Sequence, residues 1–398
     1  MSISIKNLTE EFEKNINRES YTKVKFSDLV ENIVEKVVPK TCGLKKYIGL
    51  KHLDTKSLKI RRFGSASDID GDKLKAYKGD FIFAKRNSYL KRVAIIDFEA
   101  VVSAHALVLR VKPENVNPDF LPFFMMSETF WTRAIEISVG SLSPTINWKV
   151  LAKQEFMLPS RSEQDRLVEV FKKMSVTLDS YWEVMHSLEK YKRKVAYDCY
   201  YSSESRKVNL EDLCVKIQDG SHFSPQTIHE ENSGDKFRYV TSKNIRVDGL
   251  EFKKDMFVDE EFHRSIYKRC DTVKGDLLLT KDGANTGTAT INSLEQEISL
   301  LSSVCLIRSK NELISNEYIC HYINSDIGNL NLTNQMTGTA ITRLTLTTLR
   351  KVKIPVHSKE VMDDLVIKLN YFDDNIRCVK NNIHAFNELQ KSLIEKVF

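Results

Sequence analysis

Apolar residues recur at every third or fourth position along two long stretches of this chain. The apolar positions of the first stretch include Leu167, Phe171, Leu178, Met185, Leu188 and Val195, and those of the second include Leu365, Leu369, Ile376, Ile383, Phe386 and Leu393. One polar residue interrupts each series, Lys192 in the first and Gln390 in the second. A repeat that averages about 3.5 residues predicts a long helix whose apolar seam packs against a partner helix.

The two series are spaced as copies of one another. Leu365 stands 198 positions after Leu167, and Gln390 stands 198 positions after Lys192. Two unrelated amphipathic helices, each burying one face on its own domain, are the alternative, but they do not account for the shared polar break. Polar residues in such a seam fix helix register at some cost in stability, and we expect this of Lys192 and Gln390.

The segments that precede the two helices also match in order. The matching pairs are Tyr47–Leu53 with Tyr239–Ile245, Lys78–Lys85 with Lys274–Lys281, and Gly140–Thr145 with Gly338–Arg343. Each Lys-Gly-Asp is expected to form a turn before a buried strand, Phe81–Ala84 in the first half and Leu277–Thr280 in the second. The chain is therefore predicted to be an internal duplication of nearly 200 residues.

This duplication predicts five segments. We expect an acidic, helical lead-in at 1–22, a first globule at 23–160, a first spacer helix at 161–202, a second globule at 203–356 and a second spacer helix at 357–398. Each globule is predicted to be a mixed α/β, or α+β, domain of short strands.

A pseudo-two-fold axis between the halves would make the two spacer helices antiparallel. Leu167 would then lie near Leu393, and Val195 near Leu365. A helix of about 39 residues, at ~1.5 Å per residue, forms a rod of roughly 58 Å that would hold the two globules a fixed distance apart.

Composition and charge describe an ordinary chain. Net charge is only +6, so any functional positive charge must be clustered. The seven cysteines are scattered without a CxxC pair, which favours reduced thiols in the cytoplasm and makes a zinc site an unfavourable interpretation. Met1–Tyr21 is polar and does not resemble a signal peptide, and no run approaches 18 apolar residues, so we expect no membrane span.

The loops after the two predicted buried strands carry polar groups suited to nucleic acid. Lys85–Arg92 holds four basic residues, and its counterpart Lys281–Thr288 holds two glycines with small hydroxyl and amide groups. Lys and Arg neutralise phosphates, Arg and Asn pair with guanine and adenine edges, and glycine allows close backbone approach to phosphate. A solvated basic turn is the alternative for Lys85–Arg92. The candidate contacts are Lys51, Arg61, Arg62, Lys85, Arg86, Asn87, Ser88, Tyr89, Lys91, Arg92, Ser141, Thr145, Lys243, Asn244, Arg246, Lys281, Asn285, Thr286, Thr339 and Arg343.

Motifs for catalysis are missing from the sequence. There is no Asn/Asp-Pro-Pro-Tyr methyltransferase motif, no Walker lysine and no nucleophile–base pair. We interpret His52, His105 and His222, which lack metal-ligand spacing, as structural or surface residues. The chain is therefore expected to be a non-catalytic protein that binds no metal.

The doubled order of these segments, each leading into a long helix, resembles the specificity subunit of type I restriction–modification systems over almost the whole chain. That resemblance implies two target-recognition domains that read the halves of a bipartite site in duplex DNA. It implies that the spacer helices dock two adenine-N6 methyltransferase subunits and that two restriction subunits can join. This chain would bind no cofactor, since S-adenosylmethionine belongs to the methyltransferase and ATP with Mg²⁺ to the restriction subunits.

Two departures from the family pattern stand out. The first loop reads Lys-Arg-Asn-Ser-Tyr where the second keeps the more typical glycines, and residues 1–22 have no clear match in the second half. Other interpretations stay open, namely the recognition subunit of a two-part enzyme that cuts on both sides of its site, and a standalone DNA-binding regulator. A nuclease is disfavoured by the missing motifs.

Overall fold

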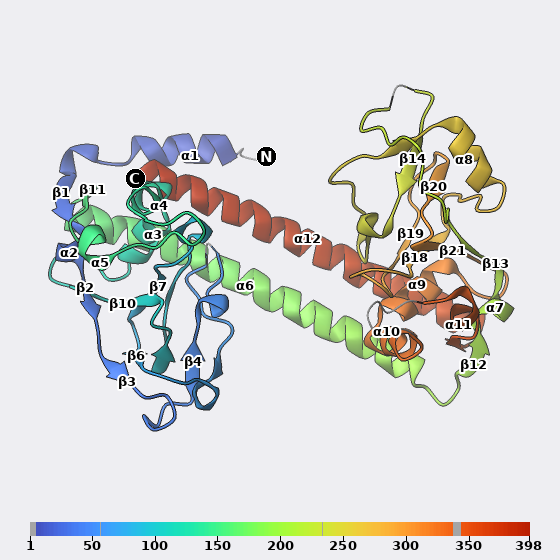
Figure 1. The fold of residues 1–398 in the computed structure, drawn as a ribbon, viewed down its shortest axis with the longest axis horizontal. Coiled ribbons are helices and arrows are strands. Elements are labelled where there is room, and N and C mark those ends of the chain that lie inside the picture. The colour runs from blue at the N-terminus through green and yellow to red at the C-terminus, as the bar shows by residue number, and fades with distance from the viewer. Residues whose placement is uncertain (1–4, 56, 233, 337–343) are drawn as a thin grey trace. The chain divides into compact units, whose positions relative to one another are not determined.

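The structure is a computed structural model that describes residues 5–55, 57–232, 234–336 and 344–398. It divides into two compact units (Figure 1). Unit 1 comprises Met1–Trp182 together with Asn381–Phe398, and unit 2 comprises Glu183–Lys380. The two long helices, α6 (Arg161–Tyr200) and α12 (Lys359–Val397), each contribute residues to both units.

Unit 1 opens with a helix and then alternates short strands with short helices. Its other elements are α1 (Ile5–Lys14), η1 (Arg18–Ser20), β1 (Thr22–Lys25), α2 (Phe26–Leu29), β2 (Val30–Ile33), β3 (Lys36–Val37), β4 (Lys46–Ile48), η2 (Leu50–His52), β5 (Gly64–Ser65), η3 (Ala66–Asp68), β6 (Lys73–Ala76), β7 (Phe81–Ala84), η4 (Ser88–Leu90), β8 (Val93–Ile95), β9 (Ala100–Val102), β10 (Ala106–Val111), α3 (Leu121–Met126), α4 (Glu128–Glu136), α5 (Trp148–Leu151) and β11 (Glu155–Leu158). The lead-in is helical, as predicted, over Ile5–Lys14.

Unit 2 repeats most of this order. Its other elements are β12 (Arg206–Asn209), α7 (Leu210–Leu213), β13 (Cys214–Asp219), β14 (Phe237–Val240), η5 (Ser242–Asn244), β15 (Ile245–Arg246), β16 (Gly249–Leu250), β17 (Phe257–Val258), α8 (Glu260–Tyr267), β18 (Leu277–Thr280), β19 (Ala289–Ile291), β20 (Ile298–Leu300), β21 (Val304–Ser309), α9 (Asn316–Asn324), α10 (Asp326–Thr333), α11 (Leu346–Arg350) and β22 (Lys353–Val356).

Equivalent sheets appear in both units and confirm the duplication. The four-stranded antiparallel sheet β2-β10-β7-β8 of unit 1 corresponds to β13-β21-β18-β19 of unit 2. The pair β1–β11 corresponds to β12–β22, and the parallel pair β4–β9 corresponds to β14–β20. The predicted mixed architecture of short strands and helices is therefore correct for both halves.

The central strand of each unit is buried on both faces. In β7, Phe81 and Phe83 pack into the core that contains the helices of unit 1, while Ile82 and Ala84 pack into a second core on the opposite face. The same alternation places Leu277 and Leu279 on one side of β18 and Leu278 on the other. Because side chains alternate along a strand, two covered faces require an uninterrupted apolar run, which both strands have.

The Lys-Gly-Asp sequence before each central strand has a structural explanation. Gly79 and Gly275 have φ of +94° and +89°, a left-handed conformation that glycine adopts without a steric penalty. The aspartate that follows is buried and receives two hydrogen bonds of 2.8–2.9 Å from an arginine, Asp80 from Arg110 and Asp276 from Arg308. These charge-assisted, bidentate pairs fix the turn that starts the strand.

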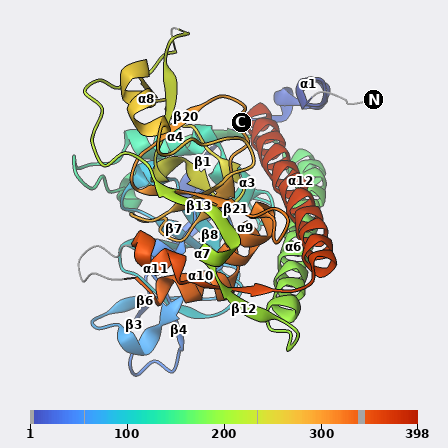
Figure 2. The same ribbon diagram turned by 90° about the vertical axis from the view of Figure 1, so that its right-hand side faces the viewer.

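In each unit the segments of α6 and α12 run antiparallel, side by side (Figure 2). In unit 1, Leu167 lies in the same core as Leu393, and the rings of Tyr181 and Phe386 are 5.8 Å apart. In unit 2, Val195 packs against the core that contains Leu365. Both pairings agree with the antiparallel prediction.

Most predicted seam positions are buried. The buried seam residues are Leu167, Phe171, Leu178, Met185, Leu365, Leu369, Ile376, Ile383, Gln390 and Leu393, while Leu188, Lys192, Val195 and Phe386 are half-buried. Lys192 forms an ion pair with Asp373 inside unit 2. That ion pair restrains the relative position of the two helix segments of unit 2, in keeping with the register role expected of a polar seam residue.

Candidate nucleic-acid interface

The loop that follows β7 in unit 1 has an unusual backbone. A single helical turn, Ser88–Leu90, is flanked by Asn87 with φ of +55° and Lys91 with φ of +47°. Of the described residues other than glycine, only these two have positive φ. Left-handed residues with a side chain cost about 1 kcal/mol or more, and such strain gathers at functional sites.

Two further segments of unit 1 hold this loop in place. The Asn87 N–H donates to the Pro144 carbonyl at 2.8 Å, and the Ser143 hydroxyl donates to Asn87 Oδ1 at 2.9 Å. Arg92 donates to the Leu50 carbonyl at 2.8 Å, which brings the exposed Lys51 alongside. The structure therefore assembles Lys51, Lys85–Arg92 and the Ser141–Thr145 segment into one surface.

Side chains on this surface differ in what they can contact. Lys85, Arg86 and Asn87 are half-buried, and Tyr89 is 58% exposed. Lys91 is paired with Glu128. Ser88 is only 1% exposed, so its burial assigns it to supporting the turn rather than to contacting a ligand.

His105 lies in the positive electrostatic potential of this loop. Its Nε2 lies 3.5 Å from the Arg86 guanidinium. Burial, and after it the charges of Arg86 and Lys85, lower the pKa of His105. A neutral imidazole beside two cations leaves their attraction for an anion such as phosphate intact.

Arg61 and Arg62 belong to another part of unit 1. Both reach Asp54, Arg61 at 3.9 Å and Arg62 through a closer ion pair, and Arg61 also lies over the Trp182 ring. The same segment is tied to α6 by a 2.5 Å ion pair between Lys59 and Asp179. Arg61 is therefore held against the long helix, whereas Arg62 is held by Asp54.

Unit 2 builds the same loop from glycines. Gly283 and Gly287, with φ of +105° and +89°, occupy the places of Asn87 and Lys91. The Thr280 N–H donates to the Thr288 carbonyl at 2.9 Å, as the Ala84 N–H donates to the Arg92 carbonyl at 3.0 Å. The departure noted between the two sequences is therefore a change of side chains on a shared backbone conformation.

The other candidates of unit 2 divide into exposed and structural residues. Lys243 is exposed, and Asn285 and Thr286 are half-buried at the loop. Asn244 is 4% exposed and accepts a hydrogen bond from the Thr241 N–H at 2.9 Å, so burial assigns it a structural role. His52 does the same in unit 1, accepting from the Gly49 N–H at 3.0 Å. Thr339 and Arg343 lie outside the described residues.

A turn outside the predicted contact residues joins the loop of unit 2. Asp219, at the end of β13, forms a 2.7 Å ion pair with Lys281, and both side chains are less than a tenth exposed. Gly220, Ser221, His222 and Phe223 follow. The Asp-Gly pair at the end of β13 was the available signal, since Asp-Gly marks turns.

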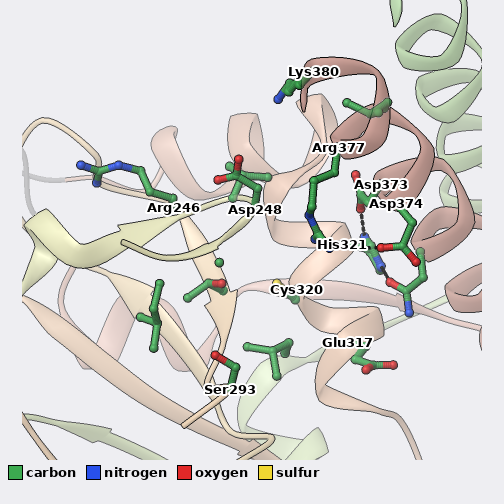
Figure 3. A pocket seen from close by; sticks show the side chains of 17 residues that line it. Arg246, Asp248, Ser293, Glu317, Cys320, His321, Asp373, Asp374, Arg377 and Lys380 are labelled. Carbon is green, nitrogen blue, oxygen red and sulfur yellow. Dashed lines mark hydrogen bonds and ion pairs between the residues drawn. The ribbon is translucent and has the colours of Figure 1, made fainter. Parts of the chain in front are cut away.

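Arg246 lines a pocket in unit 2 (Figure 3). The pocket, of about 850 Å³, lies between the hairpin β15–β16, α9 and α12. Arg246 pairs with Glu251 at 2.8 Å, and Arg377 pairs with Asp374 at 3.2 Å. His321, whose pKa is lowered mainly by burial, bonds to Asn370 at 2.8 Å. Mixed charge of this kind suits a polar partner surface better than phosphate alone.

The described residues contain no group of three or more His, Cys, Asp or Glu side chains that could hold a metal ion. No helix within the same ranges is long and apolar enough to cross a membrane. The loop of each unit instead carries cationic and amide groups. Its backbone has left-handed residues, which are Asn87 and Lys91 in unit 1 and Gly283 and Gly287 in unit 2. Groups of this kind position a phosphate backbone and read base edges.

Comparison with known proteins agrees with this duplicated architecture. The family model for the type I restriction modification DNA specificity domain matches residues 19–180 and again residues 202–385. The chain therefore belongs to the family of type I restriction–modification specificity subunits, and its two halves are DNA-recognition domains. A comparison with curated protein sequences gives no match.

Two solved structures share the fold. One is the S subunit of a type I restriction–modification system from M. genitalium, which is 14% identical, has a TM-score of 0.56, and is matched over 96% of each chain. The other comes from work on complex assembly and conformational transition of the type I R-M system, is 14% identical with a TM-score of 0.56, and is matched over 95% of this chain and 97% of that one.

Proposed function

We propose that this chain selects the DNA sequence on which a type I restriction–modification complex acts, each unit contacting one half of a bipartite duplex site. The observation that carries this proposal is the repeated loop after β7 and β18. Its backbone conformation is shared while its side chains differ. A shared backbone with different polar groups suits two modules that dock on DNA in the same way and read different bases.

The chemistry of the complex would come from its partners. Adenine-N6 methyltransferase subunits would bring S-adenosylmethionine, and restriction subunits would bring ATP and Mg²⁺. This chain would contribute recognition and assembly and carry out no catalytic step. Its long helices would dock the methyltransferase subunits.

Exposed apolar side chains on the long helices support that docking role. In unit 2, Tyr191 and Tyr197 of α6 are 60% and 54% exposed, and Ile367 and Tyr371 of α12 are 69% and 67% exposed. Aromatic residues are enriched at protein interfaces, and clustered exposed apolar groups on a soluble protein mark binding surfaces.

The decisive experiment is co-expression of this chain with its methyltransferase partner, followed by long-read mapping of N6-methyladenine. We expect a bipartite motif with a fixed unspecified gap that is absent when this chain is omitted. A soluble complex that methylates no new motif would overturn the proposal and favour a standalone DNA-binding regulator.

A matched pair of variants separates scaffold from readout. Leu178→Asp places a charge at a position of α6 that is 8% exposed, and we expect loss of folding of unit 1 and of the complex. Val176→Asp, two residues earlier and 65% exposed, should leave assembly unchanged. Equal behaviour of the two variants in gel filtration with the methyltransferase would contradict the helix-packing role of Leu178.

A further inference from the structure

Phe223 is the most exposed aromatic side chain in the described part of the chain, at 81%. Single exposed apolar residues are common on protein surfaces and need no explanation by themselves. The position of Phe223 does need an explanation, because several contacts anchor the turn that carries this side chain.

Backbone contacts fix that turn on the edge of the neighbouring strands. The Ser221 N–H donates to the Leu300 carbonyl at 2.7 Å, and the Ser302 N–H donates to the Ser221 carbonyl at 2.8 Å. Gly220 approaches so closely that a Cβ there would lie 2.1 Å from the Leu300 oxygen. Any side chain at this position would therefore force the turn away from the strand.

Ser221 also holds Phe223 directly. Its hydroxyl accepts from the Phe223 N–H at 3.1 Å and donates to the Phe223 carbonyl at 2.8 Å. The two bonds restrain the backbone on both sides of the exposed ring. A ring on a restrained backbone loses less conformational entropy when it is inserted into a partner.

The buried ion pair links this turn to the recognition loop. Lys281, the first residue of that loop, is 2.7 Å from Asp219, the first residue of the turn. His222, 58% exposed, lies 3.4 Å from the same carboxylate. The exposed ring and the polar loop of unit 2 are thus fixed relative to one another by a contact that excludes water.

We propose that Phe223 is an aromatic wedge that inserts against one base step of the half-site bound by unit 2. The inference rests on the proposed function, because it assigns a role within DNA binding. Among DNA surfaces the base stack is the one that accepts an apolar ring, and phenylalanine is among the residues that unstack and kink base steps from the minor groove. In unit 1 an exposed aromatic ring, Tyr89, is presented by the loop after β7 itself.

The test uses the full chain in complex with its methyltransferase and duplexes that carry 2-aminopurine at each position of the unit 2 half-site in turn. The methylated adenine is left unlabelled, because methyltransferases flip their target base out of the stack. We expect fluorescence to rise at one step on binding, because unstacking relieves quenching. Phe223→Ala should abolish the rise and weaken DNA binding about tenfold, while Phe223→Trp should restore both, since any aromatic face can stack on a base. Val247→Ala, 58% exposed elsewhere in unit 2, is the matched control and should change neither.

Several outcomes would overturn the wedge. It fails if no position brightens with the unaltered chain, or if the rise persists in Phe223→Ala. It also fails if Phe223→Ala binds the methyltransferase poorly, which would make the ring a protein contact. Failure of the proposed function itself looks different, because then the unaltered complex methylates no motif at all.

Discussion

The loops after β7 and β18 follow the same path with different residues. Unit 1 uses Asn87 and Lys91 where unit 2 uses Gly283 and Gly287, and all four have positive φ. Unit 1 offsets the strain with side-chain contacts, from Ser143 to Asn87 and from Lys91 to Glu128. In unit 2 the glycines need no such support, which leaves the side chains around them free to change.

Each loop begins with the same residue, a lysine, but the two lysines lie in different environments. Lys281 is buried and paired with Asp219, whereas Lys85 is half-buried, and sheet register places Val34 where unit 2 has Asp219. A half-buried lysine without a carboxylate partner at this position can meet a phosphate, but a buried, paired lysine serves the structure. Equivalent positions in a duplicated protein can therefore carry different roles.

Breaking the buried pair should have the largest effect. Asp219→Ala leaves Lys281 buried without its partner, and we expect unit 2 to lose about 3–5 kcal/mol of unfolding free energy. The measurement is hydrogen exchange of the Leu278 and Leu306 amides, with Ile82 and Val108 of unit 1 as internal controls. The double variant Asp219→Val with Lys281→Met should lose much less, and equal losses would contradict a pairing role.

Removing a cation from the loop of unit 1 should weaken one half-site only. For Arg86→Ala we expect a loss of ~1–3 kcal/mol of DNA-binding free energy if this side chain pairs bidentately with a base. Affinity is measured at one fixed salt concentration on duplexes altered in one half-site at a time.

Arg62→Ala removes the same charge from the segment paired with Asp54 and serves as the control. An equal loss of DNA affinity in both variants would mean that Arg86 contributes only to the overall positive electrostatic potential of unit 1.

Exchanging the left-handed residues should change stability by unequal amounts in the two units. Gly287→Ala forces a side chain into φ of +89° and places its Cβ 3.1 Å from Asn329 Nδ2, so we expect a loss of about 1–2 kcal/mol of stability. Lys91→Gly relieves strain but loses the ion pair with Glu128, and its net change should stay within about 0.5 kcal/mol. Thermal unfolding of both variants checks this, and a costly Lys91→Gly would show that the loops differ in conformation.

The pH dependence that His105 gives to unit 1 should be the smallest effect. The pKa of His105 is lowered by burial and then by Arg86 and Lys85. Because its folded-state pKa lies below the unfolded value, stability falls as pH drops through about 6.5.

Phosphate bound beside the two cations would raise the pKa of His105, so DNA binding should strengthen as pH falls, by about threefold for half a pKa unit. His105→Gln should remove this dependence in titrations at pH 6 and pH 8.

The architecture could be predicted because it rests on periodic patterns. Seam residues such as Leu167 and Leu393, and the runs Phe81–Ala84 and Leu277–Thr280, report burial directly through their spacing. The site was harder, since charge alone does not say which way a side chain points. Arg61 and Arg246 are ordinary cations in the sequence, and only folding brings them to Asp54 and Glu251.

The turn that begins at Asp219 could not be predicted from the sequence for a similar reason. Asp219 and Lys281 are far apart in the sequence, and no local pattern links them before β13 and β18 are placed in one sheet. The residue types of Ser88 and Asn244 predict DNA contacts, but the bends that bury these side chains depend on the surrounding chain.

The division of the chain also sets an order of events at the ribosome. Unit 2 is one continuous segment, whereas the core of unit 1 contains Leu393 and Val397, and the Phe398 ring lies 5.2 Å from that of Phe124. At a synthesis rate of roughly 5–20 residues per second, unit 1 emerges first yet waits many seconds for the residues that close its core. The half that is made first is therefore finished last, and during that interval its unclosed aromatic core is the part of the nascent chain most in need of chaperone protection.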